Sequence, residues 1–274
     1  MTTLTNDTPR FRNSPMVETI LGVQFKPLRS FRANHYGWFW SKFLVEAGWV
    51  VVAEERLLPT YVERFDDLKL LLTQPSGDDE PVTGVRMKMR NPANKRTLQL
   101  QPDKLYYGWN RQGDEPFSYA EAKADFTELV QRFANFATDS GLGSLEPNLW
   151  EVAYVNHIPS GPLWTEPTDW HKVFPKFFPA ASPEARGLRF ASYDGHWHFE
   201  IEPCLGRVHA QVAKVVMNQG TQASLMLKLT GRGAIGGGGA VDWSTGLDLG
   251  HQSCFDLFCA AISDDAKREW GFDK

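Results

Sequence analysis

Short strand-like runs follow one another along this chain with very little sequence between them, and this feature most constrains the fold. Between residues 49 and 109, five runs of apolar and β-branched residues are separated by turns rich in Asn, Asp, Pro and Gly. The turns at 91–94 and 101–103 are far too short for a crossover between parallel strands. Neighbouring runs must therefore pair antiparallel.

Helical patterns interrupt these runs. Apolar residues at helical spacing predict helices at about 31–48, 118–139, 169–178 and 245–262. The other runs predict strands at 19–25, 149–158, 188–193, 196–202, 207–217 and 222–230. The order strand, helix, several strands, helix thus occurs twice. We expect an α+β fold with an antiparallel sheet and covering helices, built as two loosely similar halves, 1–145 and 146–274, in one continuous body.

Composition excludes several classes of protein. Of 274 residues, 42% are hydrophobic, which is enough to bury a core, and the net charge of −4 gives no general reason to expect nucleic acid. No signal peptide and no membrane-spanning stretch is recognised, so we expect a cytoplasmic protein without membrane contact. The three cysteines, Cys204, Cys254 and Cys259, are expected to be buried free thiols.

One predicted strand carries side chains suited to metal binding. Alternation places His196, His198 and Glu200 on one face, and His209 on the next strand can join them. Imidazole and carboxylate groups are ligands of zinc. A divalent metal is the one cofactor we consider, and it would make the protein a metal-dependent hydrolase or nuclease. The alternative is a solvated strand face.

Another predicted strand is basic. Arg86, Lys88 and Arg90 share one face, and Arg96 follows on the next strand. A row of cations can follow a phosphate backbone, and the aromatic residues at 106–109 can stack on bases. This pattern predicts a nucleic-acid-binding sensor as a second alternative. Ion pairing with the acidic residues of neighbouring segments is the competing interpretation.

Motifs of catalysis are otherwise missing from the sequence. The segment Gly231–Gly239 matches GxGxxG, but it lacks both a βαβ unit and a GK[ST] ending, so we interpret it as a flexible linker. Neither GxSxG nor HExxH occurs. The abundance of aromatic residues instead favours a non-enzymatic binding protein that works as a homo-oligomer or with a partner protein. Trp164 and Trp170 are candidates for its binding surface.

Several short motifs, in this order and spacing, resemble a known family. They are Ser14-Pro15-x-x-Glu18, the stretch 98–109 ending in Trp109, the stretch 150–156 ending in Asn156, and the C-terminal stretch 251–271 that contains Trp270-Gly271. The chain resembles a family of uncharacterised, sporadically distributed bacterial proteins over nearly its whole length. Its strand usually has Arg-Tyr where Ala153-Tyr154 stands here.

That resemblance implies an accessory role, such as in bacterial defence or toxin–antitoxin immunity, and no assigned activity. The motif residues also have structural interpretations. Pro15 fixes the entry to the first strand, Glu18 accepts hydrogen bonds at its start, and Trp109 and Trp270 anchor the core. Asn156 either satisfies a buried turn or lines a pocket.

Overall fold

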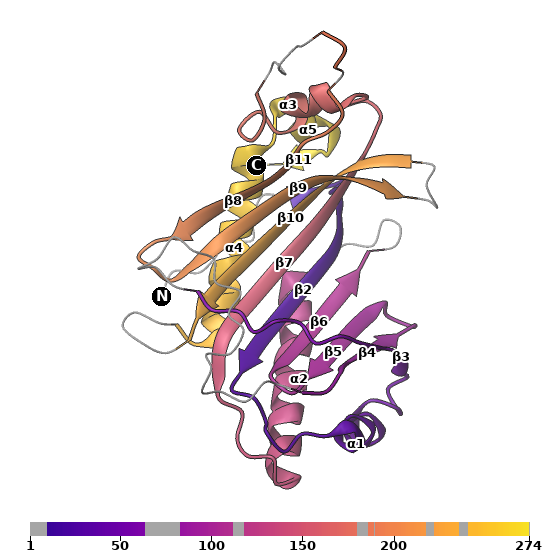
Figure 1. Ribbon diagram of the computed structural model, residues 1–274, viewed down its shortest axis with the longest axis vertical. Helices are drawn as coiled ribbons and strands as arrows, with labels where there is room; N and C mark the ends of the chain where they lie inside the picture. Colours follow the sequence, from indigo (N-terminus) through magenta and orange to yellow (C-terminus); the bar gives the residue numbers. More distant parts are fainter. Residues whose placement is uncertain are drawn as a thin grey trace.

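The computed structural model describes residues 10–63, 83–111, 118–179, 186–188, 190–217, 222–235 and 241–273. Its main strands are β2 (Met16–Phe25), β3 (Val50–Glu55), β4 (Arg86–Asn91), β5 (Arg96–Gln101), β6 (Lys104–Asn110), β7 (Pro147–Pro159), β8 (Asp194–Ile201), β9 (Gly206–Met217) and β10 (Gln222–Ala234). They form one antiparallel sheet in the order β3-β4-β5-β6-β2-β7-β10-β9-β8 (Figure 1). A separate small sheet pairs β1 (Arg10–Phe11) with β11 (Phe272–Asp273).

Each half of the main sheet is built in the same way. In the first half β2 pairs with the last strand of that half, β6, and in the second half β7 pairs with the last strand, β10. β2 and β7 also pair with each other at the centre, so that one sheet runs through both halves. The predicted α+β class with an antiparallel sheet is confirmed.

The long helices cover one face of this sheet. The helical elements are α1 (Ala33–Phe43), α2 (Tyr119–Asp139), η1 (Pro167–Asp169), α3 (Trp170–Val173), α4 (Trp243–Ala261) and α5 (Asp264–Glu269). Leu21 lies between Tyr107 and Val152 in the strand register; Tyr107 packs on α2, and Val152 packs against α4. Both helices are therefore on the same side, as Figure 1 shows. None of the described helices is long and apolar enough to cross a membrane.

Some predicted boundaries are wrong for local reasons. The helix predicted at 31–48 is shorter: it ends at Phe43, because Leu44 leaves the helical conformation (φ −121°), and the chain continues in turns to Gly48, which has a positive φ of 82°. The helix predicted at 169–178 is only α3 after the short η1, since Pro175 prevents its continuation. In 188–193 the described residues form no strand. Of the five strand-like runs between residues 49 and 109, the second, at 69–74, lies outside the described residues.

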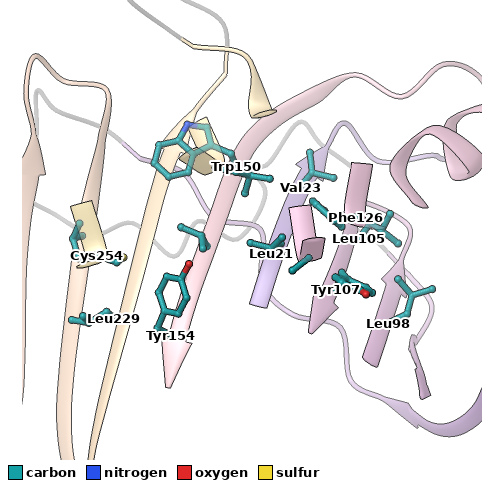
Figure 2. Packing of buried hydrophobic residues seen from close by; sticks show 14 of the residues in the cluster. Leu21, Val23, Leu98, Leu105, Tyr107, Phe126, Trp150, Tyr154, Leu229 and Cys254 are labelled. Carbon is teal, nitrogen blue, oxygen red and sulfur yellow. The ribbon is translucent and has the colours of Figure 1, made fainter. Parts of the chain in front are cut away.

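Aromatic rings fill the space between helices and sheet in the N-terminal half. Phe133 of α2 lies 5.3 Å from Phe39 of α1 and 5.9 Å from Phe25 of β2, measured between ring centroids. Phe39 also contacts Phe136 at 5.4 Å. Figure 2 shows the neighbouring part of this layer, where Phe126 faces the residues of the sheet. The side chain of Phe133 is completely buried, so large rings set the spacing between these layers.

In the C-terminal half, α4 lies very close to the sheet around Trp150, which is labelled on β7 in Figure 2. Glycines surround this fully buried ring: a Cβ atom on Gly233 or Gly246 would lie within 2.4 Å of it. A Cβ on Gly231 would lie 3.0 Å from the backbone of Gly250. The interpretation of 231–239 as a flexible linker is therefore wrong for its first part. Gly231 and Gly233 belong to β10, and the part at 236–239 lies outside the described residues.

Two further expectations about exposure are wrong. Trp164 and Trp170 are buried and pack edge to face at 6.0 Å, so they offer no binding surface. The three cysteines are free, as predicted, but only Cys254 is fully buried, Cys259 is partly buried and Cys204 is exposed.

Candidate functional site

The face of the sheet opposite α2 and α4 is crossed by residues 56–63, here named the crossing segment. Its backbone bonds Gln101 on β5 at 3.0 Å, and Tyr61 exchanges hydrogen bonds of 2.9 and 3.0 Å with Gln24 on β2. Glu63, at its end, reaches β9. Figure 1 shows this segment passing in front of the strands. Part of the N-terminal half is thereby bound to the C-terminal half.

Buried charges lie beneath the crossing segment. Nε of Arg232 on β10 donates a hydrogen bond of 2.8 Å to Glu151 on β7, and a terminal guanidinium nitrogen forms an ion pair with the same carboxylate at 2.7 Å. The guanidinium lies 3.7 Å from the centre of the Tyr61 ring. Lys104, which is 0% exposed, pairs with Asp103 at 2.8 Å. Burial lowers the pKa of Lys104, although the charge of Asp103 acts in the opposite direction. These opposite charges satisfy one another, so the cluster holds the crossing segment in place.

Glu63 connects this cluster to two histidines. Its carboxylate accepts hydrogen bonds from Arg207 (2.9 Å) and from Nε2 of His209 (2.8 Å). Burial raises the pKa of Glu63, but the hydrogen bonds of His209 and Arg207 outweigh it and lower the pKa overall. The Nδ1 atoms of His209 and His198 are 2.9 Å apart. Burial and the neighbouring histidines lower the pKa of His198. A carboxylate and two imidazoles thus form a continuous chain.

The residues of the predicted metal site are placed on two neighbouring strands. His196, His198 and Glu200 share the uncovered face of β8, and His209 lies opposite His198 on β9. Glu200 accepts a hydrogen bond of 3.2 Å from Sγ of Cys204. In the part of the chain that the structure describes, no group of three or more ligating side chains is arranged to hold a metal ion. A metal site built from all four residues stays a prediction.

The basic strand forms ion pairs within the sheet. Arg86, Lys88 and Arg90 share the face of β4 that points away from the long helices. Arg86 donates to Glu55 on β3, and Nζ of Lys88 lies 3.9 Å from the same carboxylate. This arrangement matches the cross-strand ion pairing that competes with nucleic-acid binding as an explanation of the pattern.

Arg96 and the nearby aromatic residues do not extend this basic face. Arg96 lies on the opposite face, where its Nε is 3.9 Å from Asp125 of α2 and its guanidinium is within 6 Å of the Tyr107 and Trp109 rings. Tyr107 and Trp109 are buried on that side, and Tyr106 is buried on the other. The expectation that these rings can stack on bases is wrong, because all three are inaccessible.

The motif residues of the family resemblance are tied into the fold. The carbonyl of Pro15 accepts a backbone hydrogen bond from β7 at 3.0 Å. Glu18 is half-buried, and burial raises its pKa. Trp109 and Trp270 are core residues, as expected. Asn156 donates to a backbone carbonyl of β10 at 3.2 Å, which ties its side chain to the sheet.

The two outer strands of the sheet differ in what they expose. On β3, Val50, Val51 and Val52 are consecutive and are 42, 45 and 46% exposed. On β8, polar residues alternate with aromatic ones, and Trp197 stacks on Phe177 at 4.6 Å. An outer strand presents unpaired N–H and C=O groups along its free side. Among the residues that the structure describes, no strand pairs with the outer side of β3, so this side combines unpaired backbone groups with an apolar surface.

Comparison with models of protein families found no match, and comparison with curated proteins found none. The resemblance to a family of bacterial proteins, and the accessory role that it implies, therefore stay predictions.

Proposed function

We propose that this protein is a non-enzymatic binding protein that works as a homodimer joined through strand β3. Among the described residues eight large hydrophobic side chains are exposed, and five of them lie between residues 38 and 52. Three of the five are the consecutive valines of β3. Natural sheets usually protect such edges with charge, Pro or a covering segment, and a concentrated apolar surface is typical of an interaction site. This concentration is the observation that carries the proposal.

A second copy of the chain is the partner that this edge fits best. Every neighbouring pair in the main sheet is antiparallel. A two-fold axis beside β3 would place the strand antiparallel to its own copy and continue the same hydrogen-bond pattern. In a two-fold contact both copies use the same surface, so the assembly is complete with two chains; such dimers are the commonest symmetric assembly. Neighbouring residues of a strand point to opposite faces, so the valines of the two copies would meet on both faces of the joined sheet.

The enzymatic alternative has less support. The buried charges below the crossing segment pair with one another, and the histidine chain ends at the exposed His198 on the surface of β8. Binding of nucleic acid is also less well supported, because the aromatic residues expected to stack on bases, Tyr106, Tyr107 and Trp109, are buried.

The test is the molar mass in solution of the wild type and of two matched variants, measured by light scattering after gel filtration at several concentrations. We expect the wild type to have twice the chain mass of 31.0 kDa. Val51→Lys places a charge on the edge and should give a monomer. Val216→Lys changes a valine that is 61% exposed near the end of β9 and should leave the dimer intact. A monomeric wild type, or a dimer that survives Val51→Lys, overturns the proposal.

A further inference from the structure

A pair of histidines stands on the other edge of the sheet, away from the proposed dimer strand. His196 and His198 are two residues apart on β8, on the same face, and both are exposed. Side chains at this spacing on a strand start about 7 Å apart and point the same way. Two imidazoles in this relation can reach one ion between them.

The ring of His198 is held in a defined orientation. Its Nδ1 contacts Nδ1 of His209 at 2.9 Å, and Nε2 of His209 donates to Glu63 at 2.8 Å. Glu63 is itself 1% exposed and held by Arg207. Nδ1 of His198 is thus engaged toward the protein, and Nε2 is the ring nitrogen left for a ligand. Histidines that bind metals usually have their other nitrogen engaged in this way.

We propose that His196 and His198 bind a divalent ion of the borderline class, Cu²⁺, Ni²⁺ or Zn²⁺, with water completing its coordination. These ions favour imidazole nitrogen. These roles differ from those in the metal site predicted from the sequence, in which all four residues are ligands. Here His209 positions His198 and is itself hydrogen-bonded to Glu63, and the Glu200 carboxylate accepts a hydrogen bond from Cys204. A site with two protein ligands, on an exposed strand, binds its ion reversibly.

The proposal is tested with Cu²⁺ alone, added to the untagged full chain, by calorimetry and by electron paramagnetic resonance. We expect one bound ion per chain with hyperfine splitting from nitrogen. His198→Ala and His196→Ala should each weaken binding at least tenfold. His209→Gln should weaken it about tenfold while the spectrum keeps its nitrogen splitting, because the two ligands remain. His171→Ala, which changes a partly exposed histidine on α3, should leave the affinity unchanged.

Equal affinity of the wild type and His198→Ala would overturn the proposal. So would a loss on His171→Ala as large as that on His196→Ala, because it would place the ion elsewhere. Thermal melting of each variant without metal shows whether the fold is kept, and all these side chains except His209 are at the surface. The site lies on β8, so the outcome is independent of whether β3 forms the dimer.

Discussion

The two halves of the molecule share their order of elements but hold their long helix against the sheet differently. In the N-terminal half, rings such as Phe39 and Phe133 stand between the helices and the strands. In the C-terminal half, α4 lies almost on the strands at Gly246 and Gly250, and the single ring of Trp150 fills the interval. The same order of elements therefore allows either a wide or a narrow space between the long helix and the sheet. Side chains in the narrow space of the C-terminal half have less room to rearrange, so substitutions there should reduce the free energy of unfolding more.

The largest effect is expected for Trp150→Ala. The ring is 0% exposed and touches glycines from two strands and a helix, so its removal leaves a large cavity. We expect a loss of about 4 kcal/mol in the free energy of unfolding, measured in urea. Leu188→Ala, at a residue that is 78% exposed and far along the chain from the proposed dimer strand, should change it by less than about 0.5 kcal/mol. Similar values for the two variants would contradict the packing described for the C-terminal half.

Next in size is Glu63→Ala, which tests the link between the halves. It removes a buried carboxylate and leaves Arg207 and His209 without their partner. Breaking a buried pair from one side costs about 3 kcal/mol. Glu269→Ala, which removes an exposed carboxylate on α5, should be close to neutral. A small loss on Glu63→Ala in urea unfolding would show that the crossing segment contributes little to joining the two halves.

A smaller loss, about 2 kcal/mol, is expected for Gly250→Ala. The added Cβ would lie 2.6 Å from both Trp150 and Val152, so α4 must move away from the sheet. The loss should exceed the gain in helix propensity that Ala normally brings. Thermal melting gives the measurement, and an unchanged or raised melting temperature would mean that α4 can shift at no cost.

These positions also show what the sequence can and cannot predict. The lengths of the turns and the alternation of side chains along a strand were enough to predict the antiparallel sheet and the shared face of His196 and His198. Both features depend only on residues that are close together in the sequence. Gly233 resembles part of a linker in its local composition, and its role depends on Trp150, far away in the sequence. Glu63 carries no local signal at all. Its partners on β9 are 144 and 146 residues away, so only the folded chain shows that it joins the histidines.

The contact between the halves at His251 should make stability depend on pH. His251 of α4 stacks on Tyr119 of α2 at 3.9 Å, and its Nδ1 lies 2.6 Å from the hydroxyl of Tyr154. Burial lowers its pKa from 6.5 to about 4. The unfolded chain therefore binds the proton more readily, and stability is lost as pH falls from 6.5 toward 4.

We expect this residue to account for a loss of about 1.8 kcal/mol between pH 7 and pH 5. His251→Gln carries no titrating group there, so its loss over this range should be smaller by that amount in urea unfolding at each pH. The carboxylates titrate in both proteins, and the difference between the two isolates the histidine. Parallel curves for the two proteins would show that the ring is accessible to water in the folded state.

The smallest effect has the opposite sign and gives the sharpest comparison of the halves. Gly37 lies inside α1, and a Cβ added there meets nothing within 4 Å. Gly37→Ala removes only the flexibility of glycine in a helix, so it should stabilise the protein by about 0.8 kcal/mol. The same substitution thus raises the melting temperature in α1 and lowers it in α4 at Gly250. If both variants moved in the same direction, the close approach of α4 to the sheet would not be what sets the cost of substitution in the C-terminal half.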